Sequence, residues 1–224
     1  MINIIAVSDL HSRLPDISPC DLLLIAGDIC PDGLAVTQAK WLDTSFRAWL
    51  ERIPAKEIVG VAGNHDKIFE TSPHLIPQGL RWHYLQDNSV KLFDLNIHGT
   101  PWQLPFYGAF NASDRQLESH YETISNDIDI VISHGPPFGI CDQVPSYLDT
   151  THHTGSLSLR RRLLEIKPKL VVFGHIHCSF GQVILEDILF ANVSLLNNNM
   201  DMVNRPLPFS LEISPLKINR PYIT

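Results

Sequence analysis

Residues 2–11 read INIIAVSDLH, a short apolar run that ends in a cluster of polar side chains, and this pattern decides the fold. A run that is apolar at almost every position fits a strand covered on both faces, inside the sheet of an α/β protein. The same organisation recurs four more times. The later runs are 21–26, 57–62, 128–132 and 169–173, and they end in Gly27-Asp28, Gly63-Asn64-His65-Asp66, Ser133-His134-Gly135 and Gly174-His175-Ile176-His177.

Amphipathic segments separate the strands. Apolar residues within 34–53 recur at three- and four-residue steps, which predicts a helix that Pro54 ends. Residues 156–166 predict a second helix, and residues 114–124 predict a weaker third. Strands that alternate with helices indicate βαβ units and a parallel sheet.

The later part of the chain has a different pattern. Two extended runs within residues 80–98 flank Asp87-Asn88-Ser89, which predicts an antiparallel hairpin with its turn there. Strand-like runs at 182–185, 188–193 and 209–213 follow one another without helices between them. We therefore expect a mixed α/β chain with βαβ units early and more β-structure late.

Length and composition restrict the class of protein. The 224 residues predict a single domain over 1–224, with a core over 1–200 and a proline-containing C-terminal strand and tail over 204–224. Subtracting 24 acidic from 17 basic residues gives 17 − 24 = −7, which argues against stable binding of duplex nucleic acid through a broad basic face. No apolar run approaches the ~18–20 residues that cross a bilayer, so no membrane partner is expected. Four scattered cysteines and the absence of a secretion signal predict a reduced, cytoplasmic protein.

The polar clusters after the apolar runs carry the chemistry, because α/β sheets hold ligands in the loops beyond their strand ends. These loops offer two carboxylates, one amide oxygen and four imidazoles: Asp9, His11, Asp28, Asn64, His134, His175 and His177. Seven donors exceed the needs of one ion, whereas two divalent ions that share the Asp28 carboxylate account for the whole set. Mixed nitrogen and oxygen donors favour Mn²⁺, which is our first expectation, together with Fe, Zn, Co or Ni, and favour Mg²⁺ less.

The charge of such a centre indicates its substrate. Two divalent ions against Asp9 and Asp28 leave a formal local charge of about +2, which attracts a phosphate group. Two ions roughly 3.5–4 Å apart can activate a shared water for in-line displacement at phosphorus. Hydrolysis also needs a proton for the departing oxygen, and His65 follows Asn64 without being needed in either metal site. We therefore predict His65 as general acid, with its neighbour Asp66 holding the imidazole protonated and oriented.

The ordered motifs resemble the calcineurin-like metallophosphoesterase superfamily over residues 5–177. The resemblance implies a four-layer αββα sandwich of two mixed β-sheets flanked by helices, with a dimetal centre at the sheet ends. It implies attack by a metal-bridging hydroxide, with His65 facing the scissile phosphate. The implied ligands are Asp9, His11, Asp28 and His177 for one ion, and Asp28, Asn64, His134 and His175 for the other.

Finer features resemble the small class III phosphodiesterases related to the mammalian metallophosphoesterase-domain proteins. They include Gly99-Thr100-Pro101-Trp102, Ser133-His134-Gly135-Pro136-Pro137 and Ala191-Asn192-Val193-Ser194. Members of that branch hydrolyse phosphodiesters, so the resemblance implies a small phosphoester substrate such as a cyclic nucleotide. Four residues are expected to contact that substrate, Trp102 by stacking on a base: Asn64, His65, Trp102 and Asn192.

Other functions fit parts of the pattern. A phosphomonoesterase or protein phosphatase uses the same ligands, and only parallel rates on monoesters and diesters distinguish them. A nuclease acting on DNA ends fits less well, because an acidic chain of this length has little room for a DNA-binding module. A non-catalytic scaffold of the same fold tends to lose ligands or the proton donor, which this chain keeps. The oligomeric state, the native metal pair and the role of Asn197-Asn198-Asn199 stay open at this point.

Overall fold

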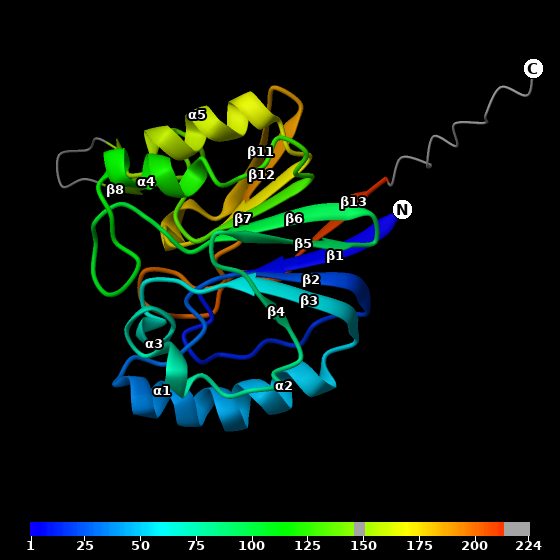
Figure 1. Ribbon diagram of the computed structural model, residues 1–224, viewed down its shortest axis with the longest axis vertical. Coiled ribbons are helices and arrows are strands. Elements are labelled where there is room, and N and C mark those ends of the chain that lie inside the picture. Colours follow the sequence, from blue (N-terminus) through cyan, green and yellow to red (C-terminus); the bar gives the residue numbers. More distant parts are fainter. Residues whose placement is uncertain (146–150, 213–224) are drawn as a thin grey trace, which may run out of the picture.

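The computed structural model describes residues 1–145 and 151–212, which form two large β-sheets packed face to face (Figure 1). The first sheet has the order β13-β1-β2-β3-β4, the second has the order β11-β12-β10-β7-β6-β5, and β8 pairs with β9 separately. The strands of the first sheet are β1 (Ile2–Val7), β2 (Cys20–Ala26), β3 (Ala55–Val61), β4 (His83–Tyr84) and β13 (Leu207–Leu211). The other strands are β5 (Asn88–Leu92), β6 (Leu95–Thr100), β7 (Ile130–Ser133), β8 (Gln143–Pro145), β9 (Thr151–His153), β10 (Leu170–Phe173), β11 (Gly181–Leu185) and β12 (Ile188–Asn192).

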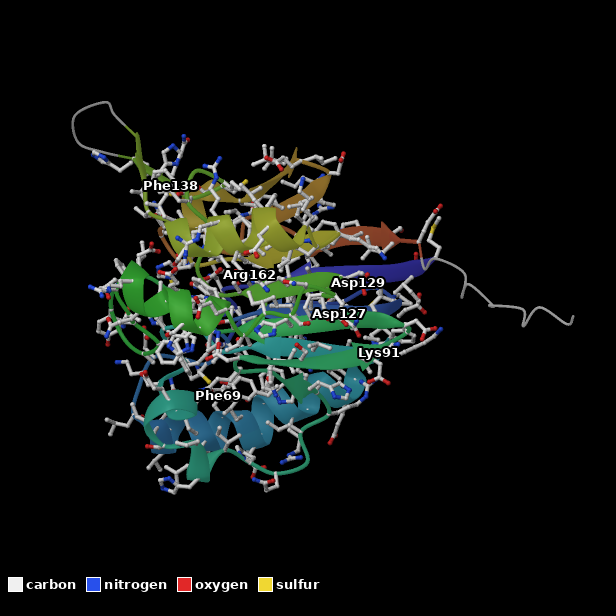
Figure 2. All side chains as sticks on the ribbon, turned by 45° about the horizontal axis from the view of Figure 1, so that its top comes forward. Phe69, Lys91, Asp127, Asp129, Phe138 and Arg162 are labelled. Carbon is white, nitrogen blue, oxygen red and sulfur yellow. The ribbon has the colours of Figure 1, made fainter. Side chains whose placement is uncertain are left out.

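Helices cover the outer face of each sheet, which completes four layers in the order α, β, β, α (Figure 1). They are α1 (Ala35–Trp41), α2 (Arg47–Arg52), α3 (Lys67–Thr71), α4 (Asp114–Tyr121) and α5 (Leu157–Ile166). One apolar cluster lies between the sheets, a second joins the first sheet to α1–α3, and a third joins the second sheet to α4 and α5. Figure 2 shows side chains filling these layers, with Phe69 on α3 and Arg162 on α5. The predicted αββα sandwich is confirmed.

The predicted helix over 34–53 is present but interrupted. A π-helical turn at Leu42–Phe46 lies between α1 and α2, where the helix locally widens. Helix α5 begins as predicted, because the Ser156 side chain accepts a hydrogen bond from the backbone N–H of Leu159 and caps its first turn.

The predicted hairpin turn at Asp87-Asn88-Ser89 is wrong. The hairpin joins β5 to β6, and its two-residue turn is Phe93-Asp94, whose φ values of 50° and 61° are left-handed as a type I′ turn requires. Asp87 instead lies where the chain passes from β4 in the first sheet to β5 in the second. The true turn contains the aromatic Phe93, whereas the crossing between sheets carries three polar residues, so the polar pattern indicated the wrong place.

Parallel pairing brings the carboxyl ends of β1, β2 and β3 together, and it does the same for β7 and β10. The Ser8 backbone N–H donates to the Val193 carbonyl at 3.0 Å, which joins the end of β1 to the segment after β12 of the second sheet. The polar clusters therefore share one edge of the molecule, at the left of Figure 1. Strand β13 pairs antiparallel with β1, and residues 213–224 of the predicted tail lie outside the described part. Within residues 1–145 and 151–212, no helix has the length and apolar character needed to span a bilayer.

Candidate metal centre

One group of predicted ligands comes mainly from the first sheet. Asp9, His11 and His177 each offer a ligand atom, and these three atoms lie within 4.8 Å of one another. His177 Nε2 is 3.3 Å from Asp9 Oδ1, and His11 Nε2 is 3.6 Å from Asp28 Oδ2. Side chains from the ends of β1, β2 and β10 therefore meet in one place.

A second group adjoins the first at Asp28. Asp28 Oδ2 is 3.4 Å from His134 Nε2. Asn64 Oδ1 is 2.9 Å from His134 Nε2 and 2.9 Å from His175 Nδ1. The structure thus brings all seven predicted ligands together, and we call them the ligand cluster. Within it, the Asp28 carboxylate contacts both groups.

Unusual backbone conformations aim these side chains. Asp9, His11, Asp28 and His175 have left-handed φ values of 54°, 40°, 51° and 69°. This region is uncommon for residues other than glycine, and such strain concentrates at functional sites. A Cβ atom at Gly174 would overlap the Asp9 carboxylate, so only glycine allows the backbone to approach so closely there.

Backbone carbonyl groups orient two of the imidazoles. His134 Nδ1 donates to the Ala26 carbonyl at 2.9 Å, and His177 Nδ1 donates to the Asn197 carbonyl at 3.1 Å. Because a carbonyl oxygen only accepts, Nδ1 carries a proton in both rings and Nε2 faces the cluster. The Asn-rich segment 197–199 therefore helps to orient His177, through the carbonyl of Asn197. The side-chain pattern of the sequence could not reveal this contact, because it uses the backbone.

Hydrogen bonds also fix Asp9, which is completely buried. Its Oδ2 accepts from Ser194 Oγ at 2.6 Å and from the His175 backbone N–H at 3.0 Å. Sequence reasoning missed this hydrogen bond of Ser194 to Asp9. The available signal was its position two residues after the end of β12, in a loop at the same edge as the ligands. Ligating carboxylates are commonly held by such outer partners.

Two buried carboxylates set the charge of the site. Burial by itself raises the pKa of Asp9, but the hydrogen bond with His177 and the surrounding imidazoles hold that pKa far below its ordinary value. Burial likewise raises the pKa of Asp28, and His134 and His11 more than offset this effect. Burial lowers the pKa of His134 and His177, yet Asp28 and Asp9 respectively raise both to about 9. Both carboxylates are therefore ionised and paired with imidazoles that hold an extra proton, and a divalent cation would take the place of those protons on binding.

A buried imidazole without partners indicates that the donor set fits metal ions. Neither ring nitrogen of His11 has a hydrogen-bond partner within the described residues. Burial lowers the pKa of His11 although Asp28 opposes it, and burial together with His134 lowers the pKa of His175 to about 4. Neutral imidazoles beside ionised carboxylates are suitable ligands for divalent transition metals. The residues present therefore fit such ions.

His65 lies against the ligand cluster and has a carboxylate partner. Its ring centroid is 4.6 Å from that of His11, and its backbone N–H donates to Asp28 Oδ1 at 2.8 Å. His65 Nδ1 is 2.5 Å from Asp32 Oδ1. Sequence reasoning missed Asp32. The available signal was a second acidic residue in the loop that carries Asp28.

The prediction that Asp66 orients His65 is wrong. The Asp66 carboxylate is completely buried and accepts hydrogen bonds of 2.7–3.0 Å from the backbone N–H groups of Ile29, Cys30 and Gly63. Burial raises the pKa of Asp66 although these donors oppose the shift. In this tight turn the His65 side chain faces the site while that of Asp66 faces the interior. Asp66 therefore ties the loop after β2 to the loop after β3.

The expected contact of Trp102 with substrate gains no support from the structure. Trp102 Nε1 donates to Asp87 Oδ2 at 2.7 Å, and its ring stacks on His120 with centroids 4.0 Å apart. It packs between two apolar clusters and does not line the cavity beside the ligands. The loop that starts at Trp102 was identified, but the wrong side chain was chosen.

The expected contact of Asn192 with substrate gains no support either, because Asn192 is completely buried and its hydrogen-bonding groups are occupied. Its Nδ2 donates to the carbonyl groups of Ile176 at 2.9 Å and Cys141 at 3.2 Å, and its Oδ1 accepts from Ser194 Oγ at 2.8 Å. Asn192 therefore fixes the loop that carries His175 and His177 instead of facing the cavity.

A cavity of about 450 Å³ opens beside the ligand cluster, within the range of about 300–1,000 Å³ typical of small-molecule sites. His65, Asn64 and His175 line it on the ligand side. No Lys or Arg lines it among the residues that the structure describes. We call the remaining, largely apolar side the apolar wall, which is formed by Leu104, Pro105, Phe106, Pro136, Val144, Ile176 and Met200.

Known proteins share both the sequence and the fold. The calcineurin-like phosphoesterase family matches residues 2–179. Metallophosphoesterase domain-containing protein 1 of Homo sapiens is 32% identical over 235 aligned residues, which cover 92% of this chain and 70% of that protein, and the Mus musculus protein of the same name gives the same values. The solved structure of phosphopantetheinyl hydrolase from Mycobacterium tuberculosis has the same fold, with a TM-score of 0.55 at 15% identity over 88% of this chain and 90% of that one. Since the family match spans most of the chain and the ligand cluster lies within it, this protein belongs to the calcineurin-like phosphoesterases and is a metal-dependent phosphoesterase.

Proposed function

We propose that this protein is a phosphodiesterase that uses two divalent metal ions, Mn²⁺ first among them, to hydrolyse small phosphodiesters such as cyclic nucleotides. Asp28 is the shared ligand. One ion would be held by Asp9, His11, Asp28 and His177. The other would be held by Asp28, Asn64, His134 and His175. When bound, two such cations supply Lewis-acid activation and charge neutralisation for attack of water on phosphorus.

The chain's own residues supply the proton transfer. Asp32 accepts a hydrogen bond from His65 Nδ1, which orients the imidazole and leaves Nε2 as the nitrogen from which a proton is transferred. From beside the cluster, His65 donates this proton to the departing ester oxygen. Asp66 supports the same geometry at a distance, by holding the loop that carries His65.

The observation that carries the proposal is the convergence of seven nitrogen and oxygen ligands beside His65, at a cavity large enough for an organic group. The lining favours diesters over monoesters. A diester carries one negative charge where a monoester carries up to two, and the described lining offers no Lys or Arg to pair with the second. The cytoplasm is the expected location, and a small phosphoester the expected partner.

The test compares bis(4-nitrophenyl) phosphate with 4-nitrophenyl phosphate at saturating Mn²⁺. Diester activity should exceed monoester activity, and a diester rate below about one-hundredth of the monoester rate would overturn the preference. His65→Gln should lower kcat by about 10²–10³-fold while metal content is unchanged. Equal slow rates for wild type and His65→Gln would favour the scaffold, and activity that survives a chelator would contradict metal dependence.

A further inference from the structure

The cavity differs from the ligand cluster in charge. Among the residues that the structure describes, the ionisable lining groups come from the cluster and its neighbour His65, except the thiol of Cys178 and the phenol of Tyr121. Its other polar lining is uncharged and includes Gln103, Ser156 and Asn198. The cavity thus has a charged end at the ligands and a neutral, largely apolar remainder.

Cationic side chains on neighbouring elements have partners elsewhere. Lys67 Nζ donates to the Tyr107 hydroxyl at 2.7 Å, and Arg160 Nη1 donates to the Phe138 carbonyl at 3.1 Å. Arg162, labelled in Figure 2, donates to the Asn126 side chain at 2.7 Å. These cations do not line the cavity, so an anionic group placed against the apolar wall would lose water without gaining a cationic partner.

We infer that the apolar wall restricts the substrate to phosphoesters whose organic group is uncharged and largely apolar, such as an aromatic ring, and excludes those with a second phosphate or a carboxylate. This inference rests on the proposed function, because it needs the reacting phosphate to lie at the ligand cluster. Burying an unpaired anion costs far more than burying an apolar ring gains. The cavity therefore discriminates mainly by exclusion of charge.

Met200 is a position at which a substitution can change the exclusion of anionic groups from the cavity. It lines the cavity from the loop after β12 and belongs to none of the three apolar clusters, so a polar residue there leaves the core intact. Lysine has the same unbranched stem and adds a positive charge, whereas glutamine adds polarity without charge. Phe106→Lys provides a second position, since Phe106 is 71% exposed and tolerates a charge.

The experiment measures binding of monomethyl phenylphosphonate and its 4-carboxy derivative to the Mn²⁺-loaded protein by titration calorimetry. The ligands share a singly charged phosphonate that replaces the reacting diester and differ by one carboxylate at the far end of the ring. Wild type should bind the ligand without the carboxylate about tenfold more tightly or better. Met200→Lys should reduce this ratio by about tenfold, while Met200→Gln should keep it within about threefold. Thermal unfolding shows whether each variant is folded, and Phe106→Lys should act like Met200→Lys.

Equal affinity of wild type for the two ligands would overturn the inference, as would equal changes in the Lys and Gln variants. Bis(4-nitrophenyl) phosphate separates this failure from failure of the proposed function. If wild type hydrolyses the diester but binds neither phosphonate, the inference fails and the proposed function stands. If it binds neither ligand and hydrolyses no ester, the proposed function fails.

Discussion

The ligand cluster and the apolar wall lie side by side but are built differently. The cluster residues follow the ends of five strands, and several are anchored twice, as Asp9 is by Ser194 and by the His175 backbone. Apart from Val144 on β8, the apolar wall comes from loops, and Phe106 within it is 71% exposed. The strand ends therefore position the metal ligands, whereas the loops determine which substrates the site accepts.

The largest effect should come from Asp28→Ala. Because Asp28 contacts both groups of donors, its loss should remove both ions and lower kcat/KM by about 10³-fold or more. Elemental analysis should find less than one Mn²⁺ per chain. The exposed Asp16→Ala is the matched control and should keep wild-type activity. Retention of two ions by Asp28→Ala would contradict the shared-ligand assignment.

Substitutions of two aspartates near His65 should change different quantities, the free energy of unfolding for Asp66 and kcat for Asp32. Asp66→Asn should lower the free energy of unfolding by about 3 kcal/mol, because buried backbone donors lose a charged acceptor. Asp32→Asn should change it by less than about 0.5 kcal/mol, because Asp32 is exposed, and should lower kcat by about tenfold. Urea unfolding and steady-state rates measure both. A stable but slow Asp66→Asn protein would restore the contradicted role of Asp66.

A smaller effect is expected at the anchor of Asp9. Ser194→Ala removes the hydroxyl that donates to Asp9 Oδ2 at 2.6 Å, so Mn²⁺ affinity should fall by about 10–100-fold with little change in kcat at saturating metal. Equilibrium dialysis measures the affinity. The exposed Ser210→Ala is the control. An unchanged affinity in Ser194→Ala would show that Asp9 does not depend on this bond.

The smallest effect should be that of Trp102→Phe. Since Trp102 lies off the cavity, KM for an aryl diester should stay within about twofold of wild type, while stability falls by about 1 kcal/mol as its bond to Asp87 is lost. Steady-state kinetics and urea unfolding measure these. A tenfold rise in KM with intact stability would return Trp102 to the substrate site.

What could be predicted from the sequence also differs between the residues at strand ends and their partners elsewhere in the chain. The mixed α/β class and all seven cluster residues were predictable, because each apolar run and its terminal polar motif are contiguous in sequence, whereas the four-layer sandwich was implied by the family resemblance of those motifs. Asp32, Ser194 and the carbonyl of Asn197 were not, since their roles depend on side-chain direction and on long-range contacts. The same physical reason explains why Asp66 does not contact His65 and why Trp102 and Asn192 do not line the cavity. The sequence pattern predicts that a residue lies in a loop, but it does not predict the direction of its side chain.

The central claim is that two cations share the Asp28 carboxylate. The most direct test is an anomalous difference map from crystals grown with MnCl₂. Two peaks about 3.5–4 Å apart are expected, both within bonding distance of Asp28. One should lie beside His11 and His177, and the other beside Asn64 and His134. A single peak, or two peaks that do not share Asp28, would contradict it.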